Sequence, residues 1–199
     1  ASGLTMRRIL RMGIGRGVFT NEAGLGSTPI AAACSSNEDP VRQGLVTMTG
    51  TFLDTVVICS LTGLCLVVTG AWSAPGLAGF RITERAWRTA LPWPAGLSSF
   101  LLMACLVFFA FSTIIGWNFY GEQCLRYLTG GSQRAQRLYR WCYLAALCAA
   151  PLLSVEAAWE LADVLNAFMA LPNLTALLLL QRQVVKGSRR VTGKYNYVN

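Results

Sequence analysis

Four long apolar segments constrain this chain more than any other feature of its sequence. We expect them at about residues 41–70, 97–120, 138–155 and 161–180. A helix of about 20 residues crosses the roughly 30 Å hydrocarbon core of a bilayer, because each residue adds about 1.5 Å. The sequence therefore predicts an all-α integral membrane protein with four transmembrane helices, surrounded by the lipid bilayer.

The composition supports this class and excludes others. Hydrophobic residues make up 54% of the chain and charged residues 13%, about half the usual share in a soluble domain. The chain has no His, which excludes metal binding and general-base catalysis by imidazole. Its seven Cys form no C-x-x-C pair, and most lie in apolar runs, as packing residues do. We predict neither an enzyme nor a transition-metal site.

The basic residues indicate topology rather than nucleic-acid binding, although the net charge is +8. Most Lys and Arg fall in residues 1–42, 126–140 and 182–199, between and after the apolar segments. The positive-inside rule places these regions, and hence both termini, in the cytoplasm. The chain also starts with Ala in an Arg-rich helical pattern, so we expect a fragment whose N-terminal part is missing. A processed product is the alternative.

A polar, Gly-rich stretch lies between the first Arg-rich piece and the apolar segments. Glu22 can pair with Arg16 to close a gate on the cytoplasmic side, and the alternative is an exposed pair worth about 0–1 kcal/mol. Glycine permits positive φ and close backbone approach. We expect a gate or hinge here, formed by Arg16, Asn21, Glu22, Gly24 and Gly26.

The second apolar segment carries the best candidates for direct binding. Thr113 and Trp117 are four residues apart and share one helical face, and Gly116 removes bulk beside them. Ser112 and Thr113 offer hydroxyl oxygens, which are hard ligands suitable for Na⁺. In the structural alternative, the hydroxyls bond to a carbonyl one turn earlier and Gly116 allows close helix packing.

Two further segments contain polar groups within apolar surroundings. Asp54 is an ionisable residue inside the first segment, so it is a candidate functional residue, with a structural polar contact as the alternative. In the last segment we expect Pro172 to kink the helix, and Asn166 and Asn173 to bond that opening or another helix. We interpret this last group as structural.

Residues 16–29 read RGVFTNEAGLGSTP and resemble the signature R-G-[LV]-F-[ST]-N-E-A-G-x-G-S-[AT]-P of the alanine or glycine:cation symporters. Val18 and Thr20 replace the commoner Leu and Ser. Further matches follow in order at residues 43–46, 52–55, 111–122 and 163–174, so the similarity covers almost the whole chain.

The resemblance implies a carrier of the bacterial inner membrane with a leucine-transporter-like fold of two inverted five-helix repeats. This chain then corresponds to part of the second repeat. Residues 1–40 hold the cytoplasmic-side end of the broken sixth core helix and a loop, residues 41–181 hold the seventh to tenth core helices, and residues 182–199 form a basic cytoplasmic tail. The missing N-terminal half is its implied partner.

The resemblance also implies roles for individual residues. Ser112 and Thr113 match positions that face a sodium ion, and Thr113 and Trp117, with Gly116 beside them, match positions that face the amino acid. The implied function is import of alanine or glycine by symport with Na⁺, or with H⁺, through alternating access. The alternatives are a truncated membrane protein that does not transport, and a carrier of another family with the same fold.

Overall fold

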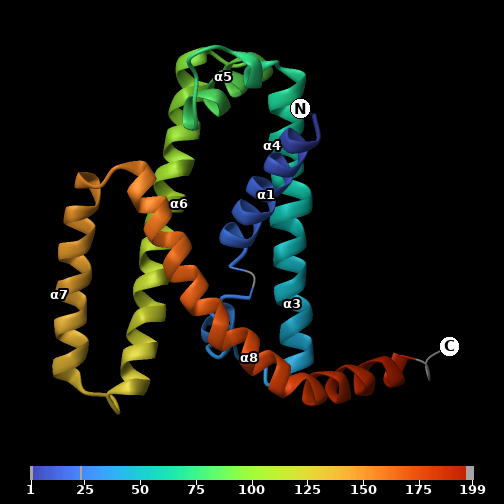
Figure 1. Ribbon diagram of the computed structural model, residues 1–199, viewed down its shortest axis with the longest axis vertical. Coiled ribbons are helices and arrows are strands. Elements are labelled where there is room, and N and C mark those ends of the chain that lie inside the picture. Colours follow the sequence, from blue (N-terminus) through green and yellow to red (C-terminus); the bar gives the residue numbers. More distant parts are fainter. Residues whose placement is uncertain (1, 23, 196–199) are drawn as a thin grey trace. The chain divides into compact units, whose positions relative to one another are not determined.

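The computed structural model describes residues 2–22 and 24–195, with side chains described for residues 5–22 and 24–189 (Figure 1). These residues form helices and connecting turns and contain no strand, which confirms the predicted all-α class. Of the predicted basic tail, residues 196–199 and the side chains of Arg190 and Lys194 lie outside the described residues.

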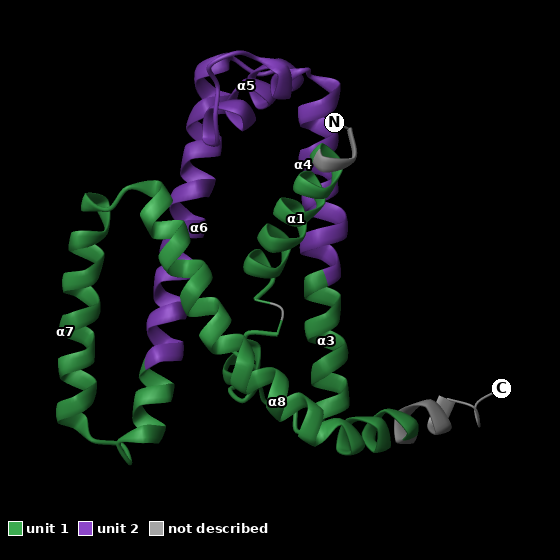
Figure 2. Cartoon of the chain, in the orientation of Figure 1, with its two compact units in different colours: residues 1–51, 122–199 green, residues 52–121 purple. Residues whose placement is uncertain are grey.

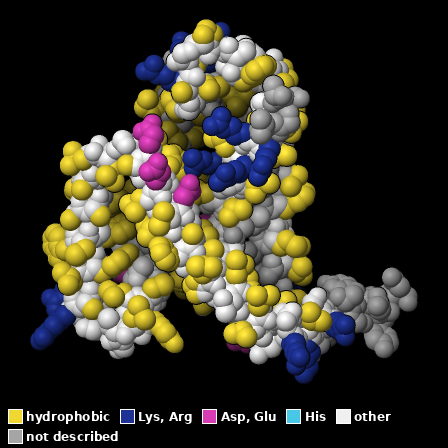
Figure 3. All heavy atoms as spheres, in the orientation of Figure 1, with side chains coloured by type: hydrophobic (Ala, Val, Ile, Leu, Met, Phe, Trp, Pro, Cys, Tyr) yellow, Lys and Arg dark blue, Asp and Glu magenta, His cyan; other side chains and the backbone are white. Residues whose placement is uncertain are grey.

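Three helical segments in the described part of the chain are long and apolar enough to cross a membrane. They are Pro40–Val68, Ala95–Leu128 and Val155–Arg189. The first is continuous through α3 (Pro40–Phe52), a π-helical turn η1 (Leu53–Ile58) and α4 (Cys59–Val68). The second is α6 (Ala95–Leu128), and the third lies within α8 (Val155–Tyr195). Their most apolar parts contain no buried residue, and Figure 3 shows hydrophobic side chains along the exposed helix surfaces. This surface is suited to contact with lipid.

The segment predicted at residues 138–155 corresponds to α7 (Gln133–Ala149), which starts and ends several residues earlier than expected. Pro151 explains the early end, because proline has no backbone N–H to bond a carbonyl four residues earlier and its ring clashes with that carbonyl. A short 3₁₀ turn, η3 (Ala150–Leu152), follows. With 17 residues, α7 falls short of the three longer helices, and its membrane crossing stays a prediction.

The charged regions next to the apolar segments are more helical than expected. Most of the basic region 126–140 lies in α6 and α7, and the region from residue 182 continues α8 as far as Tyr195. At its other end, α8 begins at Val155, where the Ser154 hydroxyl accepts a 3.2 Å hydrogen bond from the Ala157 N–H. A serine in this position satisfies one of the free donors at a helix start.

The chain divides into two compact units, shown in Figure 2. Unit 1 comprises residues 1–51 and 122–199. It contains α1 (Ser2–Thr20), the short α2 (Thr28–Ala32), α3, the end of α6, α7 and α8. Arg140 on α7 forms a two-point ion pair with Glu122 on α6, one contact being 3.1 Å from Nη2 to Oε2. This pair joins the two helices on either side of their short connection.

Unit 2 comprises residues 52–121, and its residues 71–96 form a connector rich in Pro, Gly and Trp between two apolar helices. The connector forms a 3₁₀ turn, η2 (Ala71–Ser73), and an amphipathic helix, α5 (Phe80–Ala90). Ala71, Ala86 and Ser98 are fully buried. The Ser99 hydroxyl of α6 donates a 2.7 Å hydrogen bond to the Glu84 carboxylate of α5. The connector is therefore a folded cap on the helix ends within this unit.

Candidate functional site

The connector between α1 and α2, residues 21–27, interrupts the first helical segment of unit 1. Three of its residues have positive φ: Glu22 at 50°, Gly24 at 80° and Gly26 at 85°. Glycine adopts this conformation easily, whereas a glutamate does so only where the surrounding structure holds it. The glycine positions therefore match the expected break in the helix, and Glu22 adds strain to it.

Local hydrogen bonds hold the connector in this conformation. The Asn21 side-chain amide donates to the Gly17 carbonyl over 3.1 Å, which prolongs the end of α1. The Ser27 hydroxyl donates to the Glu22 carboxylate, across the two glycines. Leu25 and Ser27 are buried, with 5% and 1% of their surfaces exposed. Few of the described side chains of unit 1 are buried, so this connector is one of the more tightly packed parts of the unit.

The connector is bound to α8. Asn173 donates a 2.9 Å hydrogen bond from its side-chain amide to the Gly24 carbonyl. A Cβ atom added to Gly26 would lie 3.1 Å from Asn173 Oδ1, whereas one on Gly24 would lie 3.7 Å from Leu174. The Gly26 backbone therefore approaches α8 so closely that a side chain does not fit without a shift. Asn173 therefore bonds the connector, whereas the sequence predicted the opening at Pro172 or another helix as its partner.

The contact with α8 lies well inside the apolar part of that helix. At about 1.5 Å per residue, Asn173 is about 18 Å along the helix from residue 161 and about 10 Å from residue 180. Pro172 precedes it, and α8 is nevertheless assigned as one helix, which changes direction along its length in Figure 1. The connector therefore contacts the interior of a predicted span rather than its end.

The expected ion pair between Arg16 and Glu22 is wrong, because each side chain has another partner. The Arg16 guanidinium lies 3.5 Å from the centre of the Trp159 ring on α8, a cation–π contact. Phe19 packs edge-on against the same indole, with ring centres 4.9 Å apart. Glu22 accepts from Ser27 instead.

A second contact region between α1 and α8 surrounds Arg16. Arg11, Met12, Gly15, Arg16 and Asp163 line a small pocket of about 240 Å³. Asp163 brings a carboxylate into a pocket that also contains two arginines. Together with the Trp159 contact, this pocket gives α1 a second attachment to α8, ten to fourteen residues before Asn173 on the α8 helix.

The predicted binding residues of the second apolar segment lie in the part of α6 that belongs to unit 2. The hydroxyls of Ser112 and Thr113 both donate to the Phe109 carbonyl, over 2.8 and 2.9 Å. This is the bonding pattern of the structural alternative. Each hydroxyl oxygen nevertheless keeps lone pairs that can accept a donor or bind a cation. Both residues are exposed.

The remaining predicted residues of this face are Gly116 and Trp117. A Cβ atom on Gly116 would have no neighbour within 4 Å, so within the described chain no helix packs against this glycine. The Trp117 ring lies edge-on to Tyr120, with ring centres 5.9 Å apart, and the residue is partly exposed. Thr113, Gly116 and Trp117 therefore form an open strip on one face of α6.

Asp54 lies in the π-helical turn η1, which the sequence does not predict. Its carbonyl accepts the N–H of Cys59, five residues ahead, over a turn wider than that of an α-helix. Such turns occur often at functional sites because they displace backbone groups from the regular hydrogen-bond pattern. An ionisable, partly exposed residue therefore lies at a local irregularity inside a candidate span.

Trp159 and Ser27 are the contact residues that sequence reasoning missed. Trp159 lies 143 positions after Arg16, and no local pattern connects the two residues. Ser27 was visible only as part of a signature, and its bond to Glu22 depends on the positive φ values between them. The polarity of residues 17–29 was the sequence signal for Ser27, and no comparable signal pointed to Trp159.

Known proteins resemble this chain over almost its whole length. The model of the sodium:alanine symporter family matches residues 1–196. An uncharacterized transporter of Haemophilus influenzae is 44% identical over 189 residues, covering 95% of this chain and 41% of that protein. The sodium/alanine symporter AgcS of Methanococcus maripaludis is 43% identical over 190 residues, 94% of this chain and 41% of its own length.

A third relative, the probable sodium/glutamine symporter GlnT of Bacillus subtilis, is 34% identical over 185 residues, 92% of this chain and 38% of its own. The chain thus spans about two fifths of the length of these relatives, while the family match extends over nearly all of the chain. The chain belongs to the sodium:alanine symporter family, a family of transporters.

Proposed function

We propose that this chain is part of a carrier that imports a small neutral amino acid, alanine or glycine, together with Na⁺. The coupling ion is Na⁺ rather than H⁺ in this proposal, because relatives of the chain carry sodium symport in their names. Transport proceeds by alternating access, in which bound ion favours the conformation that binds the amino acid. No step of bond making or breaking is required.

The observation that carries the proposal is the broken helix bound to the interior of α8. In secondary transporters, substrates and ions bind near the middle of the membrane, where interrupted helices leave backbone groups free. The connector has positive φ at three positions and is joined to Asn173. We place this connector at mid-depth, deeper than the cytoplasmic position that the charge count suggests, because Asn173 lies far from either end of the apolar stretch.

The two groups of residues then have separate tasks. Glu22, Gly24 and Gly26 form the hinge, with Asn21 continuing the end of α1 and Arg16 attaching that helix to Trp159. Thr113 and Trp117 contact the amino acid, and Gly116 leaves room for it. Ser112 and Thr113 supply oxygen ligands for Na⁺, since their acceptor lone pairs remain free. Asp54 is a further polar group of the pathway.

The proposal includes the leucine-transporter-like fold and the second inverted repeat. The exposed strip on α6 and the exposed surfaces of the three apolar helices leave space for further helices of such a protein. The partner is the N-terminal half of the same transporter, in a bacterial inner membrane. The C-terminal end of this chain lies in the cytoplasm, whereas α1 starts toward the opposite side, because Arg16 contacts Trp159 near the start of α8. The match covers 41% of the length of each of two relatives, which supports a partner that supplies the rest of the transporter.

Ligand-dependent thermal stability tests the proposal. A ligand that binds only the folded protein raises its melting temperature in proportion to its binding free energy. For the complete protein in detergent, alanine should raise the melting temperature in NaCl and have little effect in choline chloride at the same pH. An equal rise in both salts, or a rise that depends on pH and not on Na⁺, contradicts sodium coupling.

A further inference from the structure

The last part of α8 carries three basic side chains on one face. Arg182, Lys186 and Arg189 are spaced four and three residues apart, so they follow one another along the helix surface. All three are exposed. The stripe they form, called here the α8 basic stripe, directly follows the apolar residues Leu177 to Leu180 without a break in the helix. It therefore lies where a membrane helix leaves the hydrocarbon.

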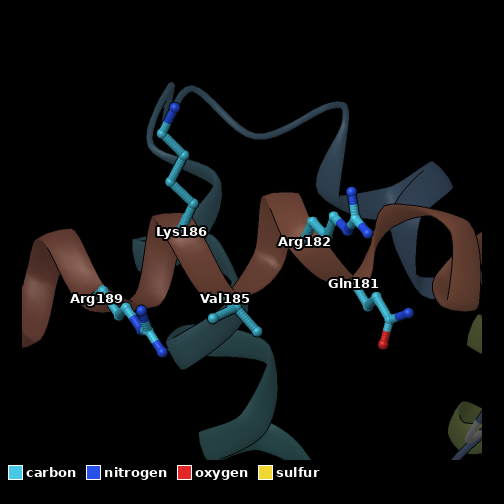
Figure 4. A pocket seen from close by; sticks show the side chains of 5 residues that line it. All are labelled: Gln181, Arg182, Val185, Lys186 and Arg189. Carbon is cyan, nitrogen blue, oxygen red and sulfur yellow. The ribbon is translucent and has the colours of Figure 1, made fainter.

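Within the described residues, no acidic side chain forms an ion pair with the α8 basic stripe. The ion pair found there joins Arg140 to Glu122 instead. Together with Gln181 and Val185 the stripe lines a hollow on the protein surface. In Figure 4 all five side chains come from one helix, and the basic ones extend away from its backbone. Val185 adds an apolar surface, 49% exposed, beside the charges.

The opposite side of the same stretch packs on α3. A Cβ atom on Gly187 would lie 3.2 Å from the Val41 side chain, so the two helices approach closely there. With about 100° of rotation per residue, the stripe lies about 100–160° around the helix from Gly187. The packing against α3 thus fixes the helix with its basic face turned outward.

We propose that the α8 basic stripe binds the phosphate groups of anionic phospholipids at the membrane surface. Arginine and lysine bind phosphate oxygens by charge-assisted hydrogen bonds. Their aliphatic stems and Val185 can lie along the upper part of the lipid chains while the charges reach the headgroups. Basic clusters directly after a membrane helix are attracted to anionic lipid in this way. This binding anchors the end of α8 independently of the transported solute.

Lipid selectivity at the protein surface tests this proposal. The complete protein is reconstituted in phosphatidylcholine bilayers that contain spin-labelled phosphatidylglycerol or, separately, spin-labelled phosphatidylcholine. Electron spin resonance measures how much of each label is immobilised by the protein. We expect a preference for phosphatidylglycerol that decreases at about 1 M NaCl, where charges are screened beyond about 3 Å. The triple variant Arg182→Gln, Lys186→Gln, Arg189→Gln should lower the preference at least about threefold.

Two control variants make the result decisive. Arg81→Gln, Arg85→Gln, Arg88→Gln removes three charges at the same spacing from α5 and should keep the preference. Arg182→Lys, Arg189→Lys conserves the charge of the stripe and should keep it as well. A triple α8 variant that matches the unaltered chain overturns the proposal. An equal loss in the α5 variant does so too, because the preference would then follow net charge and not this stripe.

Discussion

The side-chain amide of Asn173 donates a 2.9 Å hydrogen bond to the carbonyl of Gly24, a residue 149 positions earlier in the chain. Because Gly24 lies in the left-handed connector between α1 and α2, this single bond ties the break in one helix to the interior of another. A residue of α8 therefore bonds directly to the part of the chain that we propose as the transport hinge.

Removing the Asn173 amide should loosen the connector. A neutral hydrogen bond contributes about 0.5–1.5 kcal/mol, and the loss should fall on the connector because the Gly24 carbonyl is left without this donor. In Asn173→Ala, backbone amides of residues 20–30 should exchange with deuterium up to about tenfold faster, measured by mass spectrometry. Asn166→Ala, in the same helix and with no recorded contact to the connector, should leave that exchange unchanged. Equal acceleration in both variants would argue against the bond as the restraint.

A side chain at position 26 should disrupt the same contact. Gly26→Ala places a Cβ 3.1 Å from Asn173 Oδ1 at a φ of 85°, which combines steric overlap with backbone strain of about 1–2 kcal/mol. We expect a lower melting temperature in detergent and a strong loss of transport by the complete protein. Gly15→Ala, where the added atom meets no neighbour within 4 Å, should be neutral or stabilising. If both variants behave alike, the close approach at Gly26 has no role.

The Arg16–Trp159 contact should couple α1 to α8. A cation–π contact at an exposed site contributes about 0.5–1 kcal/mol. A double-mutant cycle with Arg16→Gln and Trp159→Leu measures this energy from the thermal stability of the two single variants and the double variant. Additive effects would show that the two side chains do not interact. Arg11→Gln, paired with Trp159→Leu, provides the control cycle, and it should be additive.

The sequence predicted the apolar helices better than it predicted the contacts at the candidate site. Long apolar runs and a low charge content predicted spans at about 41–70, 97–120 and 161–180, and the structure has apolar helices there at Pro40–Val68, Ala95–Leu128 and Val155–Arg189. The length of an apolar run predicts a membrane helix whatever other segments pack against it. The ends were less predictable. Pro151 stopped α7 early, while the basic residues after Leu180 continued α8 as a helix.

Contacts distant in sequence account for what the sequence could not predict. The proximity of Arg16 and Glu22 along the chain suggested an ion pair, yet Trp159 and Ser27 provide closer partners in the folded unit. The π-helical turn around Asp54 left no recognisable pattern either. By contrast, the positive φ of Gly24 and Gly26 could be expected from the sequence, since positive φ is a local property of glycine.

Hydroxyl groups on α6 should set the affinity for the ion. In the complete protein, Thr113→Val keeps the side-chain shape and removes the hydroxyl, so the Na⁺ concentration for half-maximal uptake should rise about tenfold or more, about 1.4 kcal/mol. Ser112→Ala should act in the same direction. Thr175→Val removes a hydroxyl that makes the same kind of bond to a carbonyl four residues earlier, on α8, and should change the value less than about twofold. If Thr175→Val raises the half-maximal Na⁺ concentration as much as Thr113→Val does, Thr113 has no specific role in binding the ion.

Sodium-driven uptake of alanine tests the account most directly. The complete protein is reconstituted in vesicles with equal pH on both sides, and labelled alanine is added with NaCl outside and potassium inside. We predict that alanine accumulates inside above its external concentration, and that the accumulation disappears when Na⁺ is equal on both sides. Equilibration without accumulation, or accumulation driven only by a proton gradient, would contradict the proposed sodium symport.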